Sequence, residues 1–500
     1  MRKIKESQIK FGEVSISEIK FDPRSRDEIP KLLTGLQYIY CNAEIRDEVF
    51  KILEEIIPEN IDKNNGRPGM ELWKILVLGT IRLNCNWDYD KLQEMANNHD
   101  TLRQMLGHSS GWDNKYYYPL QTLKDNVSLL TEEVLDRVNQ VVVKTGHKLI
   151  MGKKKEKDLV LKGRCDSFVV ETNVHYPTDI NLLFDAIRKV ITLILAVCHE
   201  VGMEGWRQGW YGIRKIKKLF RKAQQLKRST SKNEKIQAKR EKLIIEAHHA
   251  YIDLVKSFLE RAKESIKKLR EGKLVKETRL LEIEDYIEHA ERQISQIERR
   301  VIHGESIPAN EKVFSVFEEH TEWICKGKAG VSQELGLKVC VLPDQFGFIL
   351  YHQVMEKQTD DEMPVLMVQE AKKRFLNLNS CSFDKGFYTP LNLKELRELL
   401  DSVTLPRKGK PNKEEYTEEF IQSKRQHSAV ESGINALENH SLDRCPDHGI
   451  INFKKYVSIA VVARNIQILG NIIQQKELKR QRRIKKYKQT KAKKKLRFAA

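Results

Sequence analysis

The chain has 500 residues and a mass of 58.4 kDa, which is longer than the roughly 250–300 residues at which a single core stops growing. Lys and Arg number 89 against 70 Asp and Glu, so the net charge is +19, while 40% hydrophobic residues exclude wholesale disorder. The longest apolar stretch, 187–198, is interrupted by Arg188 and Lys189 and falls short of the ~20 residues of a membrane span. The N-terminus has no apolar signal core. We therefore expect a soluble, unexported protein of several domains, with no membrane partner.

The eight cysteines are dispersed, with no C-x-x-C pair and no neighbouring histidine pair at zinc spacing. This usage predicts reduced, mostly structural thiols in a cytoplasmic protein. A zinc site assembled across the fold is the alternative.

Positive charge is concentrated in a basic tail at 476–500. Between residues 476 and 497 there are thirteen Lys and Arg and one Glu, so this segment contributes +12 of the total charge. Such a cluster is typical of an arm that binds nucleic-acid phosphates, although a solvated end that only aids solubility has the same composition. Its apolar residues are too sparse for a membrane-binding face. The candidate DNA-binding residues here are Arg480, Arg482, Arg483, Lys485 and Lys486.

Two regions precede the first β-rich segment. Residues 1–35 are predicted to be an irregular N-terminal segment, because Asp22-Pro23 and Ile29-Pro30 favour extended or turn backbone. Residues 36–150 have a helical pattern, with short helices expected at 70–83, 89–95 and 101–106. Several short helices in a basic protein predict a helical DNA-binding domain related to helix-turn-helix modules. A helical packing domain without base contacts is the alternative.

Residues 159–174 are β-rich and contain Asp166, and the next β-rich segment begins only after residue 313. A helical insertion at 181–310 is expected between them. Within it, apolar residues follow heptad spacing over 252–269 and 280–301 around a glycine turn at 271–273, which predicts an antiparallel helical hairpin. The same apolar positions would suit a helix of a second subunit. The basic stretch 214–228 contains or adjoins several aromatic residues, so it is either a solvated face over an aromatic core or a DNA-backbone surface.

The remainder of the chain alternates strands and helices. Strands are expected at 337–342 and 348–355 around a turn at 343–345, at 380–383 before Asp384, and at 403–405. Helices are expected at 363–375, 393–400, 414–438 and 450–473. Segments 151–180 and 311–475 together predict an α/β domain.

Three acids occupy positions where burial of a charged carboxylate is unfavourable: Asp166 in a strand, Asp384 at the end of another, and Glu431 on a helix face. Burying three carboxylates together is tolerable only if cations neutralise them. If the three converge, they form an all-oxygen site suited to Mg²⁺ or Mn²⁺. Two such ions activate a water or 3′-hydroxyl and stabilise the leaving oxygen of a phosphodiester substitution.

The sequences around these acids carry a family resemblance. DSFVVETNVHYPTD at 166–179, SFDKGFY at 382–388 and HSAVESGINALE at 427–438 resemble the three acidic motifs of the DDE transposases of bacterial insertion sequences, and 323–330 and 405–410 also match. The resemblance implies a ribonuclease-H-like core, a mixed sheet flanked by helices, over roughly 163–473, so that segments 151–180 and 311–475 form the catalytic domain. It implies that Asp166, Asp384 and Glu431 are catalytic and bind two Mg²⁺ or Mn²⁺ ions. The implied activity is cleavage at element ends and transfer of the 3′-hydroxyl into target DNA.

The same resemblance implies partners and a location. The partners would be the element's terminal repeats and target DNA, and the protein would form a homodimer or larger synaptic complex in the bacterial cytoplasm, at the nucleoid. Candidate DNA contacts near the acids are Lys385, Arg407, Lys408, Lys410, Arg425 and His427, and the last two could instead orient Glu431. Glu171 is a weaker candidate metal ligand, because it would point to the other side of an ideal strand.

Two departures from the family pattern limit what carries over. One branch has Tyr, Arg and Lys where this chain has Lys424, His427 and Glu438, and the insertion lies between the two aspartates. Two other functions therefore stay open. One is a ribonuclease-H-like nuclease that cuts without joining, and the other is a non-catalytic DNA-binding protein derived from a transposase.

Overall fold

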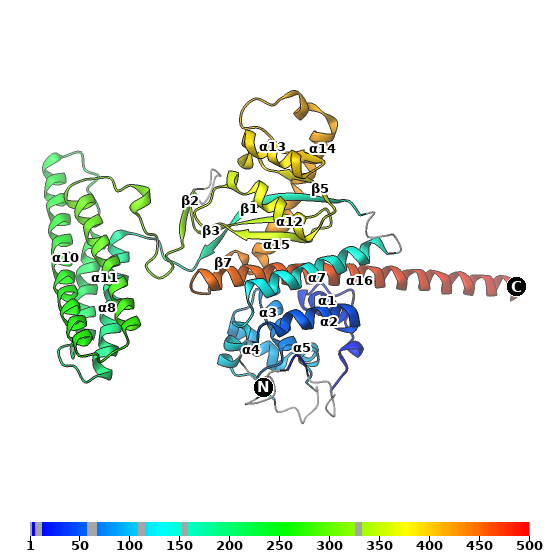
Figure 1. The fold of residues 1–500 in the computed structure, drawn as a ribbon, viewed down its shortest axis with the longest axis horizontal. Coiled ribbons are helices and arrows are strands. Elements are labelled where there is room, and N and C mark those ends of the chain that lie inside the picture. The colour runs from blue at the N-terminus through cyan, green and yellow to red at the C-terminus, as the bar shows by residue number, and fades with distance from the viewer. Residues whose placement is uncertain are drawn as a thin grey trace. The chain divides into compact units, whose positions relative to one another are not determined.

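The computed structural model describes residues 3–5, 13–57, 68–108, 116–152, 159–325 and 333–499, with side chains up to residue 490. Contacts divide the chain into two compact units, Met1–Asn173 with Ile324–Ala500, and Val174–Trp323. The first unit contains Asp166, Asp384 and Glu431 and, except for residues 322–323, the sheet. The second unit contains the predicted insertion (Figure 1).

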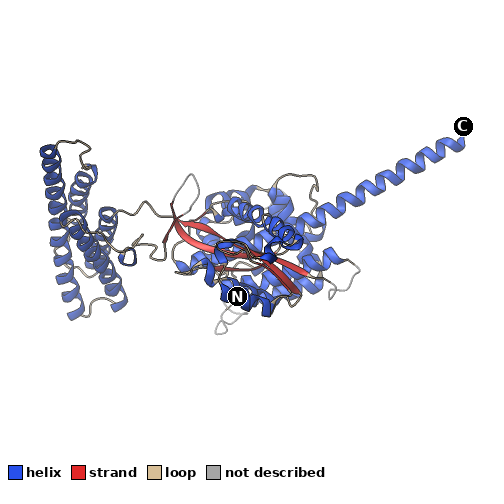
Figure 2. Ribbon diagram, turned by 90° about the horizontal axis from the view of Figure 1, so that it is seen from above, coloured by secondary structure: helices blue, strands red, loops and turns tan. Residues whose placement is uncertain are grey.

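A mixed seven-stranded sheet organises the first unit (Figure 2). Its strands are β1 (Leu161–Thr172), β2 (Glu322–Cys325), β3 (Gln333–Pro343), β4 (Ile349–Val354), β5 (Leu378–Phe383), β6 (Ser402–Thr404) and β7 (Arg444–Cys445). The order is β2-β3-β1-β5-β6, with β4 beside β3 and β7 beside β1. Strand β1 runs antiparallel to β3 and parallel to β5. The predicted α/β class with a mixed sheet is confirmed, whereas the short strands β2 and β7 were not predicted.

Five helices lie in the C-terminal half of this unit. They are α12 (Pro364–Arg374), α13 (Pro390–Leu399), α14 (Glu418–His427), α15 (Ala429–Leu437) and α16 (Ile450–Ala499). Helix α12 packs across β3, β4 and β5, and α15 packs on β1. The apolar face of α15 is formed by Val430, Ile434 and Leu437, whose i, i+4, i+7 spacing directs all three toward the core.

The N-terminal helices share one core with the sheet. They are α1 (Glu28–Cys41), α2 (Ala43–Glu54), α3 (Leu72–Asn84), α4 (Tyr89–Asn98), α5 (Asp100–Met105), α6 (Leu120–Val127) and α7 (Glu132–Met151). A buried amide pair joins three elements: Asn465 on α16 donates to Asn139 on α7 at 2.6 Å and to the Ile349 carbonyl on β4 at 2.9 Å. A single cluster of buried apolar side chains runs from Ile16 to Leu469.

Helices α1 and α16 cross in unusually close contact. A Cβ atom added at Gly470 would lie 1.9 Å from the Lys31 carbonyl, and one at Gly35 would lie 2.3 Å from the Ile466 carbonyl. The two glycines therefore allow backbone-to-backbone contact that any side chain would prevent. This crossing joins the two ends of the chain within one core.

The irregular segment predicted for 1–35 is wrong from Glu28 onward, where α1 begins. Pro30 was the misleading signal. It lies in the first turn of α1, where its missing N–H costs nothing because that group has no intrahelical acceptor. Asp27 caps the helix by accepting from the Ile29 N–H at 2.8 Å.

The single helix predicted for 414–438 is also wrong. The chain forms a 3₁₀ turn at Lys413–Tyr416, then α14, then α15. Thr417 caps α14 by accepting from the Phe420 N–H, and the Ser428 hydroxyl donates to the Arg425 carbonyl at 2.8 Å between α14 and α15. Short hydroxyl side chains compete in this way with regular helical bonding.

The second unit is built from α8 (Asp179–Glu200), α9 (Gly209–Gln225), α10 (Glu234–Glu271) and α11 (Glu277–Ile297). The predicted hairpin is confirmed as α10 and α11, which turn at Gly272 and Lys273. Helix α8 also packs against both helices, and α9 packs against α8 and α10. The heptad positions are therefore buried by helices of this same unit.

Helix α16 contains an apolar window long enough to cross a membrane by length and composition. It is the only such helix in the described part of the chain, and 78% of the window is buried inside the protein. Its apolar residues are therefore accounted for by core packing against α1, α3 and α7.

Candidate active site where two parallel strands separate

Asp166 and Asp384 lie side by side at the point where β1 and β5 separate. The last paired residues of these parallel strands are Cys165 and Phe383, and each aspartate comes directly after its paired residue. Beyond this point β1 continues against β3, where Asp166 faces Val341 across the pair. Carboxyl ends of neighbouring parallel strands form the crevice in which open α/β sheets bind ligands.

Glu431 approaches the same place from α15. It lies in the first turn of that helix, directly after the buried Val430, and its side chain is exposed. Helix α15 packs on β1, the strand that carries Asp166, and the charge of Glu431 acts on Asp166. The three predicted acids thus come from a strand, a strand end and a helix into the same region of the first unit.

The environment of Asp166 is electrostatically unfavourable for its charge. Burial, and then the negative charges of Asp384, Asp360 and Glu431, raise the pKa of Asp166 to about 6, against a hydrogen bond from the Ser167 N–H that lowers it. That hydrogen bond measures 2.8 Å. Three neighbouring carboxylates therefore add to the effect of burial on the pKa of Asp166.

The fourth carboxylate, Asp360, was not predicted. It accepts from the Ser167 hydroxyl at 2.7 Å and pairs with Lys338 of β3 at 2.7 Å. A Cβ atom added at Gly386, two residues after Asp384, would lie 3.8 Å from its Oδ2. The sequence does contain an acidic run at 360–362, shortly before Pro364. Such a run is also typical of the start of a helix, so it does not by itself indicate a functional site.

His427, the last residue of α14, is a predicted DNA contact that lies near the acids. Its Nδ1 lies 3.0 Å from the Ser382 hydroxyl, two residues before Asp384, and its Nε2 is buried without a hydrogen-bond partner among the described residues. Burial lowers the pKa of His427, opposed by the charges of Asp384 and Glu431 and reinforced by that of Arg164. The imidazole is therefore neutral at pH 7, and Nε2 is available to a ligand.

The other predicted DNA contacts near the site are exposed. Lys385 directly follows Asp384, and Arg425 precedes the break between α14 and α15. Arg407, Lys408 and Lys410 lie on a loop whose Gly409 has a φ of 117°. Lys408 is close enough for its charge to contribute to the lowered pKa of Asp361, for which a hydrogen bond from Thr359 is the main cause.

Two predictions lie elsewhere in the fold. Glu171 pairs with Arg444 at 2.8 Å, beside β7 and five residues along the strand from Asp166. In the tail, α16 continues as a helix through Arg480, Arg482, Arg483, Lys485 and Lys486, all of which are exposed. The matching stretch 323–330 falls mostly outside the described residues.

The donor set fits a hard divalent cation, because it consists of carboxylate oxygens with mutual repulsion still to be neutralised. Among the described residues, no three His, Cys, Asp or Glu side chains are already arranged as metal ligands. The eight cysteines are all free. Asp166, Asp384 and Glu431 are near enough for the charges of the last two to raise the pKa of Asp166, but they are not arranged as metal ligands.

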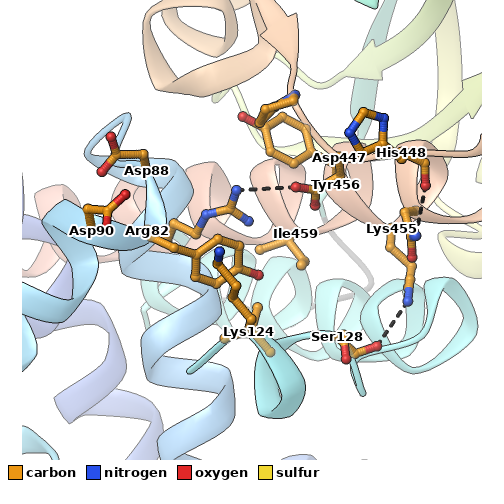
Figure 3. Close-up of a pocket in the computed structure, with 14 residues that line it drawn as sticks. Arg82, Asp88, Asp90, Lys124, Ser128, Asp447, His448, Lys455, Tyr456 and Ile459 are labelled. Atoms are coloured by element: carbon orange, nitrogen blue, oxygen red, sulfur yellow. Dashed lines mark hydrogen bonds and ion pairs between the residues drawn. The ribbon is translucent and has the colours of Figure 1, made fainter. Parts of the chain in front are cut away.

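A separate pocket of about 500 Å³ lies between the N-terminal helices and α16 (Figure 3). Its buried Arg82 bonds to Asp447 at 3.3 Å and stacks on the Tyr89 ring at 3.8 Å. Lys455 donates to the Ser128 carbonyl at 2.9 Å. None of the residues around the acidic site lines this pocket, and Arg82 and Lys455 bond to other residues of the fold.

Comparisons with known proteins leave the chain without an identified relative. No protein-family model, no curated protein and no solved structure matches it. The functional interpretation therefore depends on the residues and their arrangement.

The raised pKa of Asp166 predicts that, in the absence of divalent cations, replacing this residue by Asn increases the free energy of unfolding. Because the folded-state pKa of about 6 exceeds the usual value near 3.9, native stability falls as pH rises from about 4 through 6. We expect Asp166→Asn to be more stable than wild type by about 1–3 kcal/mol at pH 7.5, with almost no difference at pH 4. Urea unfolding in EDTA measures this.

The control for this prediction is Asp253→Asn, an exposed residue of α10. It should leave stability unchanged at both pH values. A stability difference for Asp166→Asn that is the same at pH 4 and pH 7.5 would contradict the electrostatic explanation.

Proposed function

We propose that the protein is a DNA transposase that cleaves the ends of its element and joins the 3′-hydroxyl to target DNA, using a ribonuclease-H-like core. The observation that carries the proposal is that Asp166 and Asp384 directly follow Cys165 and Phe383, the last paired residues of β1 and β5. The charge of Glu431 also contributes to the raised pKa of Asp166. The mixed sheet supports the core that the sequence motifs imply. The exposed basic tail supports a nucleic-acid substrate.

In this proposal the carboxylates of Asp166, Asp384 and Glu431 hold two Mg²⁺ or Mn²⁺ ions. When bound, such ions supply charge neutralisation and activation of a water or hydroxyl for an in-line phosphodiester substitution. The protein's own groups do the positioning. Ser167 and Lys338 hold Asp360 beside the site, and the Ser382 hydroxyl orients the His427 ring. The free Nε2 of His427 forms a hydrogen bond with the substrate or an attacking water.

DNA reaches this site along exposed cations. Lys385 lies next to Asp384, and Lys408 lies near Asp361. Both lysines can contact phosphates of a DNA strand whose end lies where β5 ends beside β1. The tail supplies further phosphate contacts. We also propose that two DNA ends are held by a homodimer or larger complex in the bacterial cytoplasm, at the nucleoid, because joining requires both ends together.

The test of this function is a combined cleavage and joining assay. Purified protein is incubated with Mg²⁺ or Mn²⁺, DNA carrying the element ends that flank its gene, and a labelled target duplex. We expect metal-dependent cuts at the ends and labelled joined product. Cuts without joined product, even from pre-cut ends, would favour a nuclease, and DNA binding with neither product would favour a non-catalytic derivative.

The tail predicts strongly salt-dependent DNA binding. Replacing Arg480, Arg482, Arg483, Lys485 and Lys486 by Gln removes five exposed cations, and within the described part of the chain only Arg480 has an acidic partner, Glu477 at 3.5 Å. We expect the slope of log K against log salt to become less negative by about 4, since each phosphate contact contributes about 0.9. Fluorescence anisotropy between 50 and 200 mM salt measures the slope. An unchanged slope would show that the tail is solvated and does not contact DNA.

A further inference from the structure

Helix α9 of the second unit has one face fixed by close packing. A Cβ atom added at Gly209 would lie 2.7 Å from the Leu195 side chain of α8, and one at Gly212 would lie 2.5 Å from the Phe258 ring of α10. Ile213 and Ile216 continue this buried face. These contacts determine the rotation of α9 about its axis and so decide which side chains it presents to solvent.

The outward face of α9 and its flanks is densely basic. Between residues 207 and 228 there are nine Lys and Arg and no Asp or Glu. All nine are exposed, and none forms an ion pair with a described residue: Arg207, Arg214, Lys215, Lys217, Lys218, Arg221, Lys222, Lys227 and Arg228. We call these nine residues the α9 basic face.

Other exposed cations of the same unit do have acidic partners. Lys263 pairs with Glu291 at 2.5 Å, and Arg270 pairs with Glu277 at 2.6 Å. Five of the twelve Lys and Arg of α10 and α11 have an acidic partner, against none of the nine of the α9 basic face. These nine cations have no acidic partner among the described residues, and a run of unpaired cations attracts a polyanion.

Two large aromatic side chains lie on this face at the start of α9. Trp210 and Tyr211 are 61% and 62% exposed, whereas nearby Trp206 is buried and donates to the Ser265 hydroxyl at 2.9 Å. Trp206 has a packing role, and the two exposed rings do not. At helical spacing Trp210 is followed on the same side by Arg214 and Tyr211 by Lys215, so rings and cations form one surface.

We propose that this surface, the α9 basic face with Trp210 and Tyr211, binds single-stranded DNA. Unpaired cations contact successive phosphates, and exposed rings stack on bases, which is the combination that sequence-tolerant single-strand sites use. Duplex DNA would satisfy the cations only, because its bases are stacked on one another. The site lies outside the acidic centre and does not depend on catalysis there.

The test compares full-length wild type with the double variant Trp210→Ala, Tyr211→Ala, using a labelled 20-nucleotide oligo(dT) and a duplex of equal length. We expect affinity for the single strand to fall about tenfold or more and affinity for the duplex to change less than twofold. Leu281→Ala, which removes a half-exposed apolar side chain from α11, is the matched control and should change neither. Equal losses for both DNA forms, or no loss, would overturn the proposal.

Photo-crosslinking separates this surface from the basic tail. Oligonucleotides containing 5-bromouracil are irradiated with the wild-type protein, and the crosslinked peptides are identified. We expect crosslinks at Trp210 or Tyr211. Crosslinks confined to the first unit would overturn the proposal while leaving the proposed transposase function intact. Loss of binding to phosphatidylglycerol vesicles in the double variant, with unchanged DNA binding, would instead identify a membrane surface.

Discussion

Replacing Asp384 by Asn is expected to reduce metal-dependent cleavage of element ends by on the order of 10³-fold. The substitution keeps the shape of the side chain and removes one of the negative charges that meet at the end of β5. Asp166→Asn and Glu431→Gln should have comparable effects, because each removes a charge from the same set. Single-turnover cleavage of labelled end DNA measures the rate.

DNA affinity is the control that separates chemistry from binding. Removing an acid from a DNA-facing site removes repulsion, so the Asp384→Asn protein should bind end DNA at least as tightly as wild type. Asp253→Asn, on α10, should cleave at the wild-type rate. Wild-type cleavage by all three site variants would rule out the proposed catalytic role of these acids.

Replacing Gly470 by Ala should destabilise the first unit by about 2–4 kcal/mol, the range of severe overpacking. The added methyl group would lie 1.9 Å from the Lys31 carbonyl, which is backbone and has no rotamer by which to move away. Helices α1 and α16 would therefore have to separate, exposing part of the core that the two ends of the chain share. Denaturant unfolding, followed by circular dichroism, measures the loss.

The matched control for this crossing is Gly433→Ala on α15. Its added Cβ atom would meet no atom within 4 Å, so it should gain up to about 1 kcal/mol from the higher helix propensity of alanine. Equal stability of the Gly470→Ala and wild-type proteins would contradict the close contact of α1 and α16.

The sheet and its acids were predictable because strands carry local signals. The run 159–174 is rich in β-branched residues, and β1 occupies 161–172 of it. Asp384 follows a short apolar strand in the same way. What sequence could not provide was the register that places Cys165 opposite Phe383, because pairing between strands more than 200 residues apart depends on tertiary packing.

Asp360 was missed for a related reason. Its partners Ser167 and Lys338 lie on β1 and β3. The sequence around Asp360 does not distinguish a carboxylate at the start of a helix from one that belongs to a functional site. The two wrong predictions also have local causes. Pro30 fits into the first turn of a helix. Ser428 interrupts the helix between α14 and α15, although the helical spacing of the sequence continues across this residue.

The most direct test of the acidic site is Fe²⁺-directed cleavage of the protein itself. Fe²⁺ replaces Mg²⁺ at oxygen sites, and the hydroxyl radicals it produces with ascorbate and peroxide cut the backbone near the bound ion. We predict cuts clustered at Asp166, Asp384 and Glu431, suppressed by excess Mg²⁺ and lost in Asp384→Asn. Absence of these cuts, or cuts that persist unchanged in the variant, would contradict a divalent-cation site formed by the three acids.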